Sequence, residues 1–155
     1  MPDDSDNSIR TATAPADALA GAGTVPEAVA RPPVVLVIED EPTITEAIRF
    51  ILQRDGWVVR THDRGHDALE CIRDGQPALV ILDVMLPGRS GFDILQAMRA
   101  QPGLAQTPVI MLTAKGHQQD RARAERDGAS LFMTKPFANA ELVAAVRHLI
   151  GQPPA

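Results

Sequence analysis

The chain has 155 residues, of which 45% are hydrophobic and 23% charged, and this balance is typical of a globular protein with one domain. The formal net charge of −5 argues against a nucleic-acid-binding protein, for which a basic face is expected. A single cysteine excludes an internal disulfide. No apolar run approaches the ~20 residues that span a bilayer, and the acidic start MPDDSDNSIR lacks the pattern of a secretory signal. We therefore expect a cytoplasmic protein without membrane insertion and without a nucleic-acid partner.

The first 31 residues differ in composition from the rest of the chain. They are rich in Ala, Pro, Gly, Thr and Asp and contain no aromatic residue. Such a segment buries too little apolar surface to offset the entropy that it would lose on ordering. We expect a flexible N-terminal tail over residues 1–31, one folded domain over residues 32–151 and a short C-terminal tail over residues 152–155.

Beyond residue 32, short runs of branched aliphatic residues alternate with amphipathic segments. The aliphatic runs predict strands at residues 34–38, 57–61, 78–82, 109–112 and 130–134. The amphipathic segments predict helices over residues 44–54, 67–73, 93–100, 118–127 and 140–149. An Asp-Gly pair follows three of these helices, where glycine can take positive φ: Gly56, Gly75 and Gly128.

This five-fold alternation of strand and helix predicts an α/β fold. Strands that are apolar almost throughout are typical of a parallel sheet covered by helices on both faces. We expect five parallel strands in the order 2-1-3-4-5, which is a flavodoxin-like (βα)5 architecture with right-handed crossovers.

Polar residues follow four of the predicted strands at the point where each strand ends. Glu39 and Asp40 follow the first strand, Asp83 the third, Thr113 the fourth and Lys135 the fifth. The carboxyl ends of parallel strands share one edge of the sheet, and ligands bind there, in the crevice between strands one and three. Neighbouring carboxylates repel and are costly to bury unless a cation compensates. The alternative is that the acids only stabilise the dipole of the following helix.

Four motifs carry a family resemblance. VVLVIEDEP, LVILDVMLPGRSGFDIL, PVIMLTA and GASLFMTKPF occur in this order across roughly residues 33–150. Together they resemble the receiver domain of bacterial two-component response regulators. The resemblance implies that a sensor histidine kinase or phosphotransfer protein donates a phosphoryl group, with Mg²⁺ as the cofactor. It also implies that the chain is not an enzyme that acts on another substrate. The chain would instead be a phosphoacceptor signalling protein that catalyses only its own phosphorylation and dephosphorylation.

The resemblance also assigns roles to the polar cluster. Asp83 would be the phosphoacceptor, and it would hold Mg²⁺ together with Asp40 and the backbone carbonyl of Met85. Glu39 would act on the metal through a water molecule. Lys135 would pair with Asp83 before phosphorylation and with a phosphate oxygen afterwards. Oxygen ligands of this kind are those that Mg²⁺ prefers.

Two further residues match switch positions of the family. Thr113 would donate its hydroxyl to a phosphate oxygen. Phe132 occupies the aromatic switch position, although an ordinary core phenylalanine is the alternative. The resemblance also predicts a cis bond between Lys135 and Pro136.

Three functional classes follow from this resemblance. We favour a stand-alone, chemotaxis-regulator-like switch that contacts a downstream protein target, because no DNA-binding or enzymatic segment follows residue 150. The alternatives are a phosphate shuttle in a phosphorelay, or a receiver fragment of a longer regulator. A receiver that binds partners without being phosphorylated is disfavoured by the complete set of Asp40, Asp83, Thr113 and Lys135.

Overall fold

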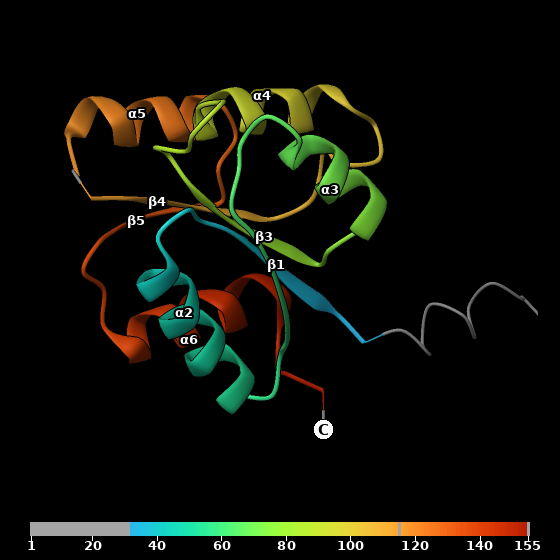
Figure 1. Ribbon diagram of the computed structural model, residues 1–155, viewed down its shortest axis with the longest axis vertical. Coiled ribbons are helices and arrows are strands. Elements are labelled where there is room, and N and C mark those ends of the chain that lie inside the picture. The colour runs from blue at the N-terminus through green and yellow to red at the C-terminus, as the bar shows by residue number, and fades with distance from the viewer. Residues whose placement is uncertain (1–31, 115, 155) are drawn as a thin grey trace, which may run out of the picture. The chain divides into compact units, whose positions relative to one another are not determined.

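The computed structural model describes residues 32–114 and 116–154, so the tail expected over residues 1–31 lies outside the described residues. In this part of the chain five strands alternate with five helices (Figure 1). The elements are β1 (Val34–Ile38), α2 (Pro42–Arg54), β2 (Val58–His62), α3 (Ala68–Gly75), β3 (Leu79–Asp83), α4 (Gly91–Ala100), β4 (Val109–Thr113), α5 (Gln118–Arg126), β5 (Leu131–Thr134) and α6 (Asn139–Ile150). The strands pair in parallel in the order β2-β1-β3-β4-β5, which confirms the predicted fold class and topology.

The sheet lies between two layers of helices. Figure 1 shows α2 and α6 on one face of the sheet and α3, α4 and α5 on the other. Side chains alternate across a strand, so Val35 and Val37 pack with α2 and α6, whereas Leu36 and Ile38 pack with α3 and α4. Every residue of the central strand β3 is buried, which explains why its sequence is apolar up to Asp83.

Two of the three predicted helix-ending glycines take the left-handed conformation. Gly56 has φ +107° and Gly128 has φ +98°, as the Asp-Gly pairs predict. The prediction for Gly75 is wrong, because this residue is the last of α3 and the left-handed position belongs to Gln76, at φ 46°. The amide side chain of Gln76 donates a 2.8 Å hydrogen bond to the carbonyl of Arg73, which helps to hold this turn.

An ion pair joins the end of α2 to α6. Arg147 donates from Nη2 and Nε to the two carboxylate oxygens of Asp55, at 2.6 and 3.0 Å. The indole Nε1 of Trp57 donates to the same carboxylate at 3.0 Å. The hydrogen bonds from Arg147 lower the pKa of Asp55 from its usual value, although burial opposes them and the Trp57 contact adds to them.

We expect Asp55→Asn to lower the free energy of unfolding at neutral pH by about 1–2 kcal/mol, because it weakens a charge-assisted pair. The pKa of Asp55 is lower in the folded chain, so this stabilisation is present above pH ~4 and is lost as the pH falls through the folded pKa. Urea unfolding should therefore show the two proteins converging below pH ~4. Asp74→Asn, at an exposed site, is the control, with a change within about 0.5 kcal/mol. A difference that stays constant down to acid pH would contradict this account.

Candidate functional site

Strand register brings the predicted site residues to one edge of the sheet. Ile38 pairs with Leu82, so Glu39, the residue after β1, lies beside Asp83, the last residue of β3. Asp83 pairs in turn with Leu112 at the end of β4, directly before Thr113. Parallel pairing therefore places the residue after β1 and the last residues of β3 and β4 side by side at the carboxyl edge.

Three carboxylates form a compact cluster at this edge. Glu39, Asp40 and Asp83 each offer one carboxylate oxygen, and these oxygens all lie within 4.8 Å of one another. Glu39 is 1% exposed and Asp83 3% exposed, whereas Asp40 faces solvent. Like charges at this separation repel strongly when two of them are withdrawn from water. A set of hard oxygen donors with one open side fits a divalent cation such as Mg²⁺.

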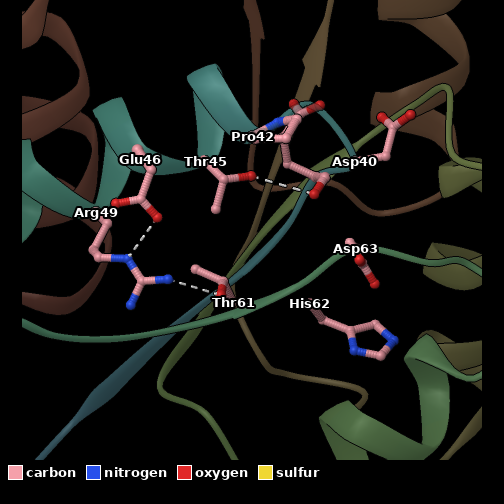
Figure 2. A pocket seen from close by; sticks show the side chains of 9 residues that line it. Asp40, Pro42, Thr45, Glu46, Arg49, Thr61, His62 and Asp63 are labelled. Atoms are coloured by element: carbon pink, nitrogen blue, oxygen red, sulfur yellow. Dashed lines mark hydrogen bonds and ion pairs between the residues drawn. The ribbon is translucent and has the colours of Figure 1, made fainter.

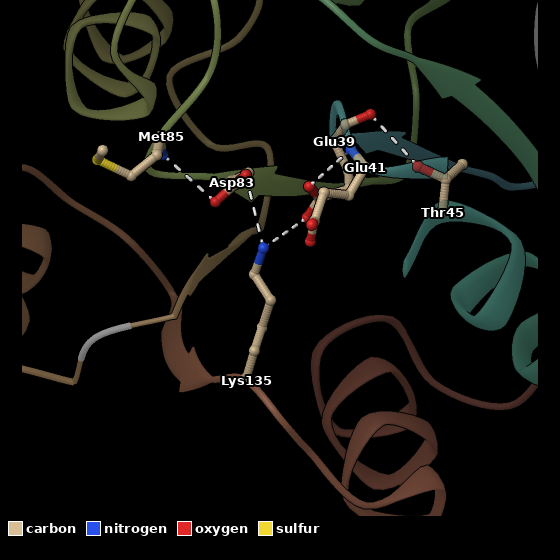
Figure 3. A network of polar contacts seen from close by, with 6 residues as sticks. All are labelled: Glu39, Glu41, Thr45, Asp83, Met85 and Lys135. Carbon is tan, nitrogen blue, oxygen red and sulfur yellow. Dashed lines mark hydrogen bonds and ion pairs between the residues drawn. The ribbon is translucent and has the colours of Figure 1, made fainter. Parts of the chain in front are cut away.

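The ammonium of Lys135 supplies positive charge inside the cluster. Its Nζ atom lies 2.9 Å from Oε1 of Glu39 and 3.6 Å from Oδ2 of Asp83 (Figure 3). The sequence predicts that Lys135 pairs with Asp83, but in the structure the Lys135 ammonium lies closer to Glu39 than to Asp83. The side chain of Glu39 is fully buried, so the ammonium takes the place of the water that this carboxylate has lost.

Glu39 has further backbone contacts that fix its position. The backbone amide of Glu41 donates to Oε2 of Glu39 at 3.2 Å, and the hydroxyl of Thr45 donates to the Glu39 carbonyl at 3.3 Å. Both donors come from the start of α2 or the residue before it. The turn from β1 into α2 therefore orients one wall of the acid cluster.

The environment of Asp83 disfavours its ionised form. Burial, followed by the charge of Glu39, raises the pKa of Asp83 to about 7, and the charge of Lys135 and the backbone amide of Met85 oppose this rise only in part. Burial by itself would lower the pKa of Lys135, but the hydrogen bond that its ammonium donates to Glu39 and the charges of Asp83 and Glu39 outweigh it, so the pKa is raised. The cluster thus has more negative charge than the single ammonium can balance.

Two neighbours of Asp83 hold the loop that follows it. The backbone amide of Met85 donates to Oδ1 of Asp83 at 3.3 Å, while the Met85 side chain is 73% exposed beside the site. At Gly91, the first residue of α4, a Cβ atom would come within 2.2 Å of the Asp83 carbonyl oxygen. Only glycine allows this approach. The sequence prediction missed Gly91, although its place in GRSG, eight residues after Asp83, is a usable signal.

Thr113 and Phe132 lie on the same face of the sheet. In the β4–β5 register Thr113 pairs with Thr134, and Phe132 pairs with Met111. Met111 and Phe132 both belong to the core under α3, α4 and α5, and Thr113 follows Met111 by two residues, so it points to that face. The bond between Lys135 and Pro136 is cis, as predicted.

A polar pocket adjoins the acid cluster on the side of β2. Its volume is about 340 Å³, and Figure 2 shows Asp40 at one end and Arg49 at the other. Arg49 donates to the hydroxyl of Thr61 at 3.0 Å and lies 3.3 Å from a carboxylate oxygen of Glu46. Nearby, His62 contacts Asp67 at 2.7 Å. Of the acid cluster, Glu39 and Asp40 line this pocket.

No helix within residues 32–114 and 116–154 is both long enough and apolar enough to cross a membrane.

Comparison with known proteins agrees with this arrangement. Residues 35–147 match the family model described as the response regulator receiver domain. The chain is 40% identical over 121 residues to "Probable transcriptional regulatory protein TcrX" of Mycobacterium tuberculosis, a match that covers 77% of this chain and 50% of that protein. The chain spans about half the length of the curated relatives it matches.

Solved structures give the same result for the fold. The chemotaxis protein CheY4 of Vibrio cholerae superimposes with a TM-score of 0.72 at 27% identity, covering 77% of this chain and 99% of that one. The BeF3-activated N-terminal receiver domain of Klebsiella pneumoniae RstA gives a TM-score of 0.71 at 30% identity, with the same coverage of 77% and 99%. This chain belongs to the response regulator receiver family.

Proposed function

We propose that this receiver accepts a phosphoryl group on Asp83 in a Mg²⁺-dependent reaction. The supporting observation is the cluster of Glu39, Asp40 and Asp83, with Lys135 in contact with two of its members. A carboxylate oxygen of Asp83 attacks the phosphorus of a phosphohistidine on a sensor kinase or phosphotransfer protein. An aspartyl phosphate forms, the bond from phosphorus to nitrogen breaks, and the donor imidazole leaves with the bonding electron pair.

Asp40, Asp83 and the backbone carbonyl of Met85 would hold the Mg²⁺ ion, and Glu39 would act on it through a water molecule. The ion, when bound, neutralises charge on the transferring phosphoryl oxygens. The exposure of Asp40 is consistent with this role, because Mg²⁺ retains several waters and needs an open side. The raised pKa of Asp83 supports the same proposal, since a nearby cation favours the ionised, nucleophilic form.

Lys135 and Thr113 act on the product. The ammonium of Lys135 lies 3.6 Å from a carboxylate oxygen of Asp83. Once Asp83 carries a phosphoryl group, Lys135 pairs with a phosphoryl oxygen instead of with the Asp83 carboxylate. The hydroxyl of Thr113, at the adjacent strand end, donates to a second phosphoryl oxygen. Phe132, on the same face, is the switch residue whose ring follows this movement.

We propose that the phosphorylated receiver signals by contacting a downstream protein, as a stand-alone cytoplasmic switch. The match covers 99% of the chain of CheY4, a chemotaxis protein, so the CheY4 chain in that structure consists of this fold with no further domain. This supports the proposal of a stand-alone receiver. A second candidate is the receiver part of a transcriptional regulator, because TcrX carries that name and is about twice as long as the match. An immunoblot of native cells separates the two: a product of this length supports the first, and a longer product supports the second.

The phosphoacceptor reaction is tested by intact-protein mass spectrometry after incubation with a small phosphodonor such as acetyl phosphate. With Mg²⁺ we expect the mass of one added phosphoryl group, and with EDTA we expect almost none, because the acid cluster then repels the incoming phosphoryl oxygens. A protein heated and cooled before the assay is the control for non-specific acylation. Equal labelling in Mg²⁺ and in EDTA would contradict the proposed role of the cation.

A further inference from the structure

The loop between β3 and α4 packs against the loop between β2 and α3. The β3–α4 loop comprises residues 84–90 and includes Met85, and the β2–α3 loop comprises residues 63–67. The backbone amide of Gly65 donates a 2.9 Å hydrogen bond to the carbonyl oxygen of Pro87. Pro87 lies two residues after Met85, so the β2–α3 loop is attached to the segment that carries the proposed backbone ligand of Mg²⁺.

Gly65 has no space for a side chain at this contact. It is buried, whereas the residues on either side of it, Arg64 and His66, are exposed. A Cβ atom at residue 65 would come within 2.4 Å of the Arg89 carbonyl oxygen and 2.9 Å of the Arg89 backbone nitrogen. Because both of these atoms belong to the backbone, no side-chain rotation can relieve the contact. Any larger residue at this position therefore has to displace the β3–α4 loop.

The β2–α3 loop is also attached to Glu39 in the acid cluster. The carbonyl oxygen of His62, the residue before the loop, accepts a 3.0 Å hydrogen bond from the Glu39 amide. The ring of His62 contacts the carboxylate of Asp67, the last residue of the loop, at 2.7 Å. The loop is thus closed on itself, and it connects the backbone of Glu39 on one side with the β3–α4 loop on the other.

We infer that Gly65 is a positioning residue for the Mg²⁺ site. Its lack of a side chain lets the β2–α3 loop hold the β3–α4 loop, and with it the Met85 carbonyl, beside the acid cluster. The amide of Met85 donates to Oδ1 of Asp83 at 3.3 Å (Figure 3), so a displaced loop alters this contact too. The inference rests on the proposed function, since the Met85 carbonyl is a metal ligand only under that proposal.

The test measures Mg²⁺ binding to the full chain by amide NMR, in a titration with MgCl₂ at pH ~8, above the pKa of Asp83 of about 7. Gly65→Ala should raise the Kd for Mg²⁺ by about 10-fold, as the loss of a group that orients a metal ligand typically does. Before metal is added, this variant should also shift the amide signals of Met85 and Leu86, which report the position of the loop. Gly103→Ala should match the wild type in both readouts, because a Cβ atom at residue 103 meets nothing within 4 Å.

Asp55→Asn separates the position of the loop from a general loss of stability. Asp55 follows the last residue of α2, whereas the acid cluster lies before the first, and its ion pair is with Arg147. This variant should therefore lower stability and leave the Kd for Mg²⁺ unchanged.

Hydrogen exchange in the wild type tests the same coupling without a variant, in case Gly65→Ala does not fold. A contact that favours Mg²⁺ binding is itself stabilised by Mg²⁺, because coupling between two sites is reciprocal. At saturating Mg²⁺ the Gly65 amide should exchange about 10-fold more slowly. The Gly128 amide, which donates to Glu125 at the end of α5, should exchange at an unchanged rate.

An unchanged Kd in Gly65→Ala would overturn the inference. The same loss of Mg²⁺ affinity in Asp55→Asn, or exchange of the Gly65 amide that does not respond to Mg²⁺, would also overturn it. A wild type that binds no Mg²⁺ would instead contradict the proposed function.

Discussion

Asp83→Asn is expected to reduce phosphoryl labelling by at least about 100-fold, because the substitution removes the only nucleophile that the proposed reaction uses. The change is nearly isosteric, so the fold should persist, which circular dichroism can verify. Labelling is measured by intact mass after incubation with acetyl phosphate and Mg²⁺. Asp63→Asn is the matched control, because Asp63 is an exposed aspartate that lines the pocket beside the acid cluster. Its labelling should equal that of the wild type.

Wild-type labelling of the Asp83→Asn protein would show that the phosphoryl group goes to another residue. Loss of labelling in both variants would show that the pocket surface, rather than the carboxylate of Asp83, limits the reaction.

The second large effect concerns stability in the absence of metal. The pKa of Asp83 is raised to about 7 in the folded chain, from 3.8, mainly by burial and then by the charge of Glu39. Ionisation of Asp83 therefore destabilises the folded state relative to the unfolded chain. This loss of stability is absent below pH ~4, grows as the pH rises to about 7, and is constant at higher pH. In EDTA, Asp83→Asn should be more stable than the wild type by about 2–4 kcal/mol at pH 8, with little difference at pH 4.

Urea unfolding across this pH range measures the difference, and Mg²⁺ provides the control. Millimolar Mg²⁺ should stabilise the wild type by mass action and leave Asp83→Asn nearly unchanged, because the variant lacks one ligand. Asp40→Asn should likewise lose the Mg²⁺ effect. A wild type that is as stable as Asp83→Asn at pH 8 in EDTA would mean that Lys135 already balances the cluster.

Most of the fold could be predicted because the apolar runs, the amphipathic segments and the polar residues at the strand ends all indicate the same alternation of strand and helix. The strands are short apolar runs, and the residues that follow them are polar, so their shared edge follows from parallel pairing alone. This explains why the predicted polar residues lie at one edge of the sheet: Glu39, Asp40, Asp83, Thr113 and Lys135. The structure differs only in making Asp83 and Thr113 the last residues of β3 and β4 rather than the residues after them. Helix ends are less well determined, as Gln76 shows, because a side-chain hydrogen bond can hold a left-handed turn without glycine.

Partner choice within the site could not be predicted from the sequence. Lys135 is closer to Glu39 than to Asp83 because the strand ends fix the distances and burial leaves Glu39 without water. The hydrogen bond from Gly65 to Pro87 depends on how two loops pack together, which the patterns of strands and helices do not specify. Close approaches such as that of Gly91 to Asp83 likewise require coordinates.

The most direct test of the account is to locate the phosphoryl group on the chain. Borohydride reduces an aspartyl phosphate to homoserine and releases the phosphate, so tandem mass spectrometry after reduction identifies the modified residue. We predict homoserine at residue 83, in protein treated with phosphodonor and Mg²⁺ and not in protein treated in EDTA. Homoserine at residue 40 or another aspartate, or aspartate retained at residue 83 in protein that carries the added mass, would contradict the assignment of Asp83 as the phosphoacceptor.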